Sequence, residues 1–401
     1  MNNLKRTIFR LLLSSVLVIS SVSFLSAMPK ISLLTAGPTD EEVFFLYGHS
    51  GIRIQDPDNG YDYVFNYGYF SMNQPNFILN FILGKPLYFL GVTTMDMFLE
   101  DYGRGGRSVT EQVLNLRPEE ARAFKDYLEW NARPENAQYQ YNFFFDNCAT
   151  RPRDLIEKFA GGLDYKTDPI KLPTFREAAR EKSHTAQWYT FGADICLGSQ
   201  SDEKMTVRDA AYLPDFLMQE LDSATRTKDG QPIILSKTEL LPQTLVLKDS
   251  GLYFPSIVFG ILLLFVGLRY FFKPYRKTDL KILAAILFSV LGLLGITLWF
   301  LAFVSEHPHM FPNENMLLFH PFWFLLIPLL FRKKSSKRSL YQEILFWLFA
   351  LSLGIFALMV LIPGGQSVPR GELLLWLCAV LLSIFAFYPD PSRITVGKPA
   401  A

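Results

Sequence analysis

Residues 254–272 read FPSIVFGILLLFVGLRYFF and form the first of five apolar runs in the C-terminal part of the chain. The other runs lie at about 282–303, 316–331, 340–362 and 371–388. Each is long enough, or nearly so, to cross about 30 Å of hydrocarbon as a helix, and the run at 316–331 is the shortest. Half of the 401 residues are hydrophobic and 19% are charged, a balance typical of membrane proteins. The pattern predicts an all-α bundle of about five transmembrane helices.

The basic residues between these runs predict how the bundle is oriented. The loop after the first run contains Lys273, Arg276, Lys277 and Lys281, and residues 332–338 after the third run are also strongly basic. The intervening loops, at 305–315 and 364–372, hold one arginine between them. Because basic loops remain in the cytoplasm, we expect the residues before 254 to lie on the opposite side of the membrane.

The N-terminus independently predicts export. Lys5 and Arg6 precede an apolar, serine-rich run that ends at about Ala27, a pattern typical of a secretory signal or of an uncleaved anchor. Leu25 occupies a position where a small residue is preferred before cleavage, so both alternatives are open. The expected organisation is a signal or anchor at 1–27, an exported domain at 28–250, a transmembrane domain at 251–390 and a cytoplasmic tail at 391–401.

Charge and cysteine content narrow the classes of function. The net charge is +1 and no basic stripe is present, which argues against nucleic acid as a partner. Cys378 falls in the last apolar run, whereas Cys148 and Cys196 fall in the exported domain. In an oxidising compartment these two cysteines could form a structural disulfide. Cys148 is therefore either part of a disulfide or a free thiol.

The exported domain shows strand and helix patterns that together predict an α+β fold. Alternating aromatic and branched residues at 43–54 and 61–67 flank the turn-forming residues 56–60, which indicates a β-hairpin. Pro118 is expected to open a helix that continues to about Trp130. The apolar stretch 77–83 is interpreted as core, with a membrane-docking or acyl-chain surface as the alternative.

Cys148 is predicted to lie at the N-terminus of a second helix. Pro152 is tolerated only near a helix start, so a helix running to Phe159 must begin close to Cys148. Helix N-terminal N–H groups favour a thiolate and can receive an oxyanion. His49, on the hairpin between two small residues, is the candidate base, and Asn66 on the paired strand is the candidate that orients its imidazole.

Several of these residue types also have ordinary structural roles. Asp146 and Asn147 could cap the helix. Arginines near the cysteine could meet a phosphate head group or pair with local acids such as Asp154; they are Arg104, Arg107, Arg151 and Arg153. His307 and His309 share a loop with Asn313 and Asn315, but no third ligand has convincing spacing, so neither a metal nor another cofactor is expected.

The histidine lies on an early strand and the cysteine on a later helix. In this order the chain resembles the circularly permuted branch of the NlpC and papain-like superfamily, which includes lecithin retinol acyltransferase. The Asn147-Cys148 pair matches the Asn-Cys motif of that enzyme. Over about residues 30–225 the chain resembles more closely the periplasmic domain of the Bacteroidetes lipoprotein N-acyltransferase family called Lnb. The motifs that carry this resemblance are Tyr47-Gly48-His49-Ser50, Asn66-Tyr67-Gly68, residues 103–108 (GRGGRS), residues 141–143 (YNF), residues 146–151 (DNCATR) and residues 195–198 (ICLG).

The resemblance implies a thiol-dependent acyltransferase at the periplasmic face of a bacterial inner membrane. It implies transfer of an acyl chain from a phospholipid to the α-amino group of a diacylated lipoprotein, through a thioester on a catalytic cysteine. The expected catalytic residues are Cys148, His49 and Asn66, and the expected substrate-binding residues are Arg104, Arg107, Arg151, Asn147 and Tyr67. The alternatives are a periplasmic cysteine hydrolase, such as a cell-wall peptidase or lipid amidase, and a non-enzymatic envelope scaffold.

Overall fold

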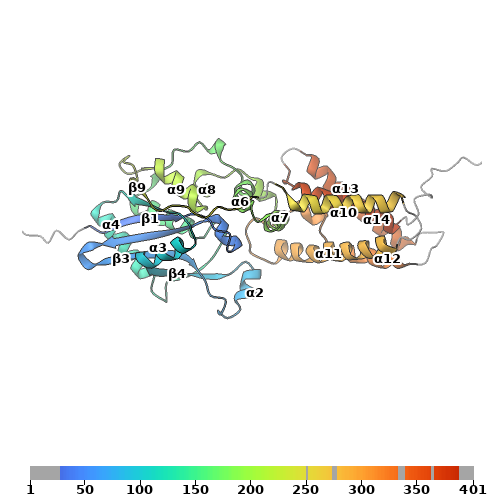
Figure 1. Ribbon diagram of the computed structural model, residues 1–401, viewed down its shortest axis with the longest axis horizontal. Coiled ribbons are helices and arrows are strands. Elements are labelled where there is room, and N and C mark those ends of the chain that lie inside the picture. Colours follow the sequence, from blue (N-terminus) through green and yellow to red (C-terminus); the bar gives the residue numbers. More distant parts are fainter. Residues whose placement is uncertain (1–27, 250–251, 273–277, 333–338, 363–364, 388–401) are drawn as a thin grey trace, which may run out of the picture.

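A computed structural model describes residues 28–249, 252–272, 278–332, 339–362 and 365–387. The predicted signal or anchor, most of the basic loop residues and the C-terminal tail lie outside these ranges. Figure 1 shows a domain built around a β-sheet, followed along the long axis of the molecule by a region of helices. This arrangement agrees with the predicted α+β domain and helical region, whereas the relation to a permuted papain-like fold stays a prediction.

Seven antiparallel strands form the main sheet, in the order β6-β4-β3-β2-β1-β5-β9. Their bounds are β1 Lys30–Ala36, β2 His49–Asp56, β3 Tyr61–Tyr69, β4 Leu87–Thr94, β5 Val109–Leu114, β6 Gln138–Gln140 and β9 Ile234–Leu241. The short strands β7 (Leu163–Asp164) and β8 (Thr225–Arg226) pair with each other separately.

The predicted hairpin is confirmed as β2 and β3, joined by the 3-10 turn η2 (Pro57–Asn59) and Gly60 in the left-handed conformation. Residues 43–47, expected to be part of the first strand, instead form a 3-10 helix, η1 (Val43–Tyr47). Strand β1 ends at Ala36, paired with His49, so the residues before His49 have no strand beside them to complete a ladder. Gly48, at φ +77°, then turns the chain into β2.

Helices cover both faces of the sheet. On one face, α4 (Pro118–Asn131), α5 (Thr150–Ala160) and α9 (Pro214–Ser223) pack against alternate strand residues that include Ile31 and Leu33. On the other face, α3 (Met95–Arg104) packs against a smaller cluster that includes Leu34 and Ala36. The two sets alternate along β1 because successive strand side chains point to opposite faces. The observed α4 and α5 agree with the two helices expected around Pro118 and Pro152.

Shorter elements complete the exported domain. They are α2 (Phe77–Ile82), α6 (Phe175–Ser183), α7 (Gln187–Cys196), α8 (Val207–Ala210), η3 (Pro169–Lys171) and η4 (Ser199–Asp202). Helix α2 corrects the interpretation of residues 77–83 as core. Its Phe77 is buried, but Ile78, Leu79, Phe81 and Ile82 are exposed.

The helical region contains α10 (Phe254–Phe272), α11 (Thr278–Phe303), α13 (Leu340–Leu361) and α14 (Arg370–Phe387). The run at 316–331 is broken into η5 (Glu314–Leu317), η6 (Pro321–Leu326) and α12 (Ile327–Phe331). Among the described residues, four segments are long and apolar enough to cross a membrane: 278–303, 314–331, 340–361 and 370–387. The apolar part of α10, Phe254–Tyr270, is shorter, so the count of five spans stays a prediction.

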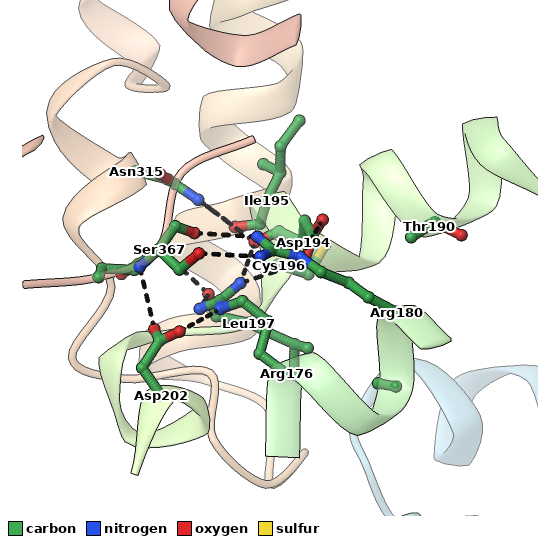
Figure 2. A network of polar contacts seen from close by, with 12 residues as sticks. Arg176, Arg180, Thr190, Asp194, Ile195, Cys196, Leu197, Asp202, Asn315 and Ser367 are labelled. Atoms are coloured by element: carbon green, nitrogen blue, oxygen red, sulfur yellow. Dashed lines mark hydrogen bonds and ion pairs between the residues drawn. The ribbon is translucent and has the colours of Figure 1, made fainter. Parts of the chain in front are cut away.

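A buried polar network joins the exported domain to the helical region (Figure 2). Arg176 of α6 is fully buried and donates hydrogen bonds to the backbone oxygens of Asp194, Leu197 and Gly198. Arg180 pairs with Asp194 and donates to Ser367, on the loop before α14. The loop after α11 also takes part, because Asn313 and Asn315 donate to the end of α7. This loop therefore has a structural role at the joint between the two parts of the chain.

Candidate active site

A cavity of about 550 Å³ opens beside η1, α3 and the neighbouring ends of β2 and β3. Figure 1 shows the β2–β3 turn at the end of the domain away from the helices, so the opposite end of this hairpin faces the helical region. Five of the predicted site residues line the cavity: Cys148, His49, Asn66, Arg104 and Arg107. The sheet thus brings together residues that lie up to 99 positions apart in the sequence.

The hydrogen bonds of Asn66 assign the tautomer of His49. Asn66 is buried on β3, and its Nδ2 donates to the backbone oxygen of Val64 and to Thr93 Oγ1, each at 3.4 Å. Its Oδ1 is therefore the acceptor that faces His49 Nε2 at 3.2 Å. Because Nε2 carries the proton in this bond, His49 Nδ1 is left as the base. Gly51 makes room for the contact, since a Cβ there would lie 2.9 Å from Asn66 Oδ1.

The side chains of Cys148 and His49 both lie close to Gly68. A Cβ added at Gly68 would lie 3.7 Å from Cys148 Cβ and 3.8 Å from His49 Cε1, so the two side chains flank one small open space. Gly68 has a φ of +114°, which strongly favours glycine. Two properties of Gly68 thus keep the space between Cys148 and His49 open. It has no side chain, and its backbone conformation disfavours any other residue.

Burial gives the cysteine and histidine unexpected protonation states. Burial raises the pKa of Cys148 to about 11, although backbone hydrogen bonds from Ser50 and Cys148 and the nearby charge of Arg107 oppose the rise. Burial and then the Arg107 charge lower the pKa of His49 to about 4, against the opposing hydrogen bond with Asn66. With the thiol pKa raised and the imidazole pKa lowered, we expect both groups to be neutral at rest, in place of the thiolate predicted from the sequence.

The helix N-terminus also differs from the expectation. Helix α5 begins at Thr150, and the N–H groups of Ala149 and Thr150 donate to Asn147 Oδ1 at 2.8 and 3.0 Å. These two amides are therefore occupied and do not face a reacting carbonyl. The backbone groups that lower the pKa of the thiol are instead those of Ser50, on β2, and of Cys148 itself.

Arg107 supplies a buried positive charge to the cavity. Its Nε donates to the Gly37 oxygen at 2.7 Å, and its guanidinium lies 4.5 Å from the centre of the Tyr102 ring. Gly106, at φ +63°, forms the turn before it, and the Gly106 oxygen accepts hydrogen bonds from the backbone of Thr244 and Leu245. Among the described residues, Arg107 Nη2 has no hydrogen-bond partner although it is buried. Because Arg107 lines the cavity, its positive charge is available to a bound anion or a polarised carbonyl.

Comparison with protein families places this site in a known domain. The family model described as the Lnb N-terminal periplasmic domain matches residues 30–181, and the model described as the Lnb transmembrane domain matches residues 248–389. The chain belongs to the Lnb family. Searches of curated proteins and of solved structures gave no match. As an Lnb protein, the chain is a membrane protein with a periplasmic domain, and the cavity with Cys148 lies in that domain.

Three residues predicted to bind substrate do not line the cavity of this Lnb domain. Tyr67 is buried and its hydroxyl donates to Asn131 Oδ1 at 2.6 Å. Arg151 pairs with Asp146 and lies 3.7 Å from the centre of the Tyr139 ring. Asn147 caps α5, as described above. These partners are internal to the domain, so the three residues shape the loop around Cys148. Arg104 does line the cavity, but it is exposed and pairs with Glu100.

Aromatic side chains of the Lnb cavity were not predicted from the sequence. Phe44, Phe70, Tyr88, Tyr102 and Tyr141 all line it. The Tyr102 ring stacks on His49 with ring centres 6.2 Å apart. The high aromatic content of the exported domain was a signal, but it does not indicate which rings converge on one cavity.

Cys148, Cys196 and Cys378 are all free thiols, so the alternative of a 148–196 disulfide is not observed in the described part of the Lnb chain. Cys196 lies at the end of α7, where its backbone oxygen accepts a hydrogen bond from Asn313. Metal chemistry also lacks a candidate site, because no three His, Cys, Asp or Glu side chains gather suitably among the residues that the structure describes.

Proposed function

We propose that this protein is a lipoprotein N-acyltransferase of the bacterial inner membrane. It would move an acyl chain from a phospholipid to the α-amino group of the diacylglyceryl-cysteine that heads a lipoprotein, through a thioester on Cys148. The supporting observation is that Cys148, His49 and Asn66 line one cavity of the periplasmic domain together with several aromatic side chains, and that His49 is hydrogen-bonded to Asn66. Membership of the Lnb family supports the same substrate class.

In the first half-reaction, Cys148 Sγ attacks the carbonyl carbon of a phospholipid ester. The thiol proton passes to His49 Nδ1 as the S–C bond forms. The C–O bond to glycerol then breaks, and His49 returns the proton to the leaving oxygen, which releases a lysophospholipid. Since a thiol of pKa about 11 is ionised to only about one part in 10⁴ at pH 7, proton transfer must accompany the attack. Asn66 Oδ1 stabilises the imidazolium through Nε2–H.

Charge that develops on the ester oxygen needs donors aimed into the cavity. The backbone groups of Ser50 and Cys148 and the charge of Arg107 already act on the thiol, and Arg107 lines the cavity. Loss of one such donor typically costs about 10²–10³ in turnover. Arg107 therefore takes the role first expected for the α5 amides, and the phosphate of the donor is its second candidate ligand.

In the second half-reaction, the lipoprotein amine attacks the thioester. An N–C bond forms, the S–C bond breaks, and the amine proton returns to Cys148 through His49. Apolar and aromatic walls disfavour water as the acceptor. The transmembrane helices keep the domain at the surface where both lipidated substrates diffuse.

The proposal is tested with full-length protein in phospholipid vesicles, using a synthetic diacylated lipopeptide as acceptor and mass spectrometry as readout. Cys148→Ala and His49→Ala are expected to abolish N-acylation, whereas the matched variant Cys196→Ser retains it. Thermal unfolding shows whether each variant is folded. Undiminished N-acylation by folded Cys148→Ala would exclude the proposed chemistry. Release of free fatty acid without an N-acylated product would instead identify a hydrolase.

A further inference from the structure

Helix α2 exposes an unusual amount of apolar surface for its length. Four of its six side chains are more than 40% exposed: Ile78 (71%), Leu79 (54%), Phe81 (48%) and Ile82 (45%). The surrounding segment, residues 72–86, contains no acidic residue. A water-facing helix of this composition would be unfavourable, whereas a helix at a membrane interface has this character.

Three contacts fix α2 at the end of a predicted membrane span. The N–H of Glu306 donates to the Leu83 oxygen at 2.8 Å, His307 Nε2 lies 2.8 Å from the Phe81 oxygen, and Lys85 pairs with Glu306. Gly84 allows this close approach, because a Cβ there would lie 2.4 Å from the His307 nitrogen. Span α11 ends at Phe303, only three residues before Glu306, so α2 lies at the same depth as the periplasmic end of α11.

The exposed face of α2 is also close to other apolar surface of the helical region. Phe303, Val304 and Phe311, at and after the end of α11, are each more than half exposed. The exposed apolar side chains of α2, from the Lnb N-terminal domain, thus lie next to the exposed apolar side chains at the periplasmic end of α11. Among possible partners, the lipid that already surrounds α11 fits this surface best.

A row of stacked rings connects α2 with the cavity. The Phe77 ring, on α2, stacks on Phe70 with ring centres 5.5 Å apart and planes 6° apart. Phe70 in turn contacts Tyr88 at 4.9 Å and Phe44 at 6.1 Å. Phe70, Tyr88 and Phe44 line the same cavity as Cys148. Ring-to-ring contacts therefore run from the buried side of α2 to the wall of the cavity that holds the candidate nucleophile.

We propose that α2 inserts its exposed face into the periplasmic leaflet of the bilayer and that the cavity rings of Phe70, Tyr88 and Phe44, against which α2 is anchored through Phe77, receive a phospholipid acyl chain from the leaflet and guide it to Cys148. This inference rests on the proposed acyl-transfer function for the use of the route, but the position of α2 in the leaflet does not. The aromatic side chains of the cavity would give the acyl chain an apolar surface and reduce its contact with water.

The position of α2 is tested with full-length protein in vesicles of phosphatidylethanolamine and phosphatidylglycerol. A fluorescent probe is attached at Ile78→Cys, in a chain with Cys148, Cys196 and Cys378 replaced by serine, and lipids carrying a spin label near the head group act as quenchers. The control site is Leu235→Cys, on β9, where the native side chain is 59% exposed. We expect at least threefold stronger quenching at residue 78. Equal, weak quenching at the two sites would overturn the proposed position of α2. This outcome does not depend on whether Cys148 is catalytic.

The route is tested with the double variant Ile78→Asn/Ile82→Asn, compared with Leu235→Asn. The α2 variant is expected to need about tenfold more vesicle phospholipid for half-maximal acyl transfer, with kcat much less affected, and Leu235→Asn is expected to behave as wild type. An unchanged lipid dependence of the α2 variant would overturn the route. If instead Cys148→Ala still transfers acyl chains while the residue-78 probe is quenched, the proposed function fails and the membrane position of α2 stands.

Discussion

At the scale of single residues, burial dominates the chemistry of Cys148 and His49. A helix N-terminus normally lowers a thiol pKa, but Asn147 occupies the first amides of α5, and little of that effect reaches the thiol. The nearby Arg107 charge favours the thiolate and disfavours the imidazolium at the same time. The pair is thus poised to exchange a proton only when a substrate carbonyl is present.

The pH dependence of alkylation tests this resting state. Iodoacetamide should modify Cys148 about tenfold faster for each pH unit between 7 and 10, because the thiolate fraction grows tenfold per unit below a raised pKa of about 11. Peptide-resolved mass spectrometry is needed, since burial also raises the pKa of Cys196 to about 11. A rate that stays constant from pH 5 to 9 would indicate a preformed thiolate–imidazolium pair and contradict the neutral state.

Gly68 offers a test of the space between the two catalytic candidates. Gly68→Ala should lower acyl transfer at least 100-fold, because the new methyl group occupies the gap between Cys148 and His49. Its positive φ should also cost about 1–2 kcal/mol of unfolding free energy. Gly60→Ala is the matched control: it has a positive φ of 62° but no neighbour within 4 Å. It should lose similar stability and keep its activity, as measured by N-acylation and thermal unfolding.

At the scale of elements, the loop before α5 depends on one asparagine. Asn147 is buried; its Oδ1 accepts from Ala149 and Thr150, and its Nδ2 donates to the backbone oxygens of Phe143 and Tyr212. These four bonds join the N-terminus of α5 to the aromatic segment before it and to the segment before α9. They therefore determine where the Cys148 side chain lies.

Asn147→Ala is expected to destabilise the domain by about 2–4 kcal/mol, since it removes a helix cap and leaves buried backbone groups unpaired. Asn136→Ala serves as comparison, because its side chain makes one exposed hydrogen bond, to the Trp130 oxygen. That variant should change stability by less than about 1 kcal/mol. Denaturation of detergent-solubilised protein gives both values, and equal losses would refute the structural role of Asn147.

At the scale of the whole molecule, the Arg176 network holds the periplasmic domain against the helices (Figure 2). Arg176 is fully buried and pairs with Asp202 at 2.9 Å, while Arg180 reaches Ser367 across the junction. This network holds the periplasmic domain at the ends of the helices. It therefore sets the distance of the cavity from the membrane and the depth at which α2 meets the leaflet.

Arg176→Ala should cost about 3–5 kcal/mol, because it removes a fully buried guanidinium that pairs with Asp202 and donates to three backbone oxygens. Arg208→Ala is the control, since Arg208 is half exposed and its ion pairs with Asp154 and Glu157 should contribute no more than about 1 kcal/mol. Hydrogen exchange of α6 and α7 in detergent measures the local effect. Protection that is unchanged in Arg176→Ala would show that the network does not hold the junction.

The sequence by itself determined the membrane-spanning class, the β2–β3 hairpin, helices α4 and α5 and the candidate set of Cys148, His49 and Asn66. These features follow from local properties: the length of an apolar run, the alternation of side chains along a strand, and the positions of proline and turn residues. Only the tertiary structure decided that Tyr67, Asn147 and Arg151 have internal partners, that residues 43–47 form a 3-10 helix, that α2 is exposed and that the pKa of the thiol is raised by its surroundings. Each of these depends on which distant residues surround a side chain, because burial and hydrogen-bond pairing arise from contacts that sequence spacing does not specify.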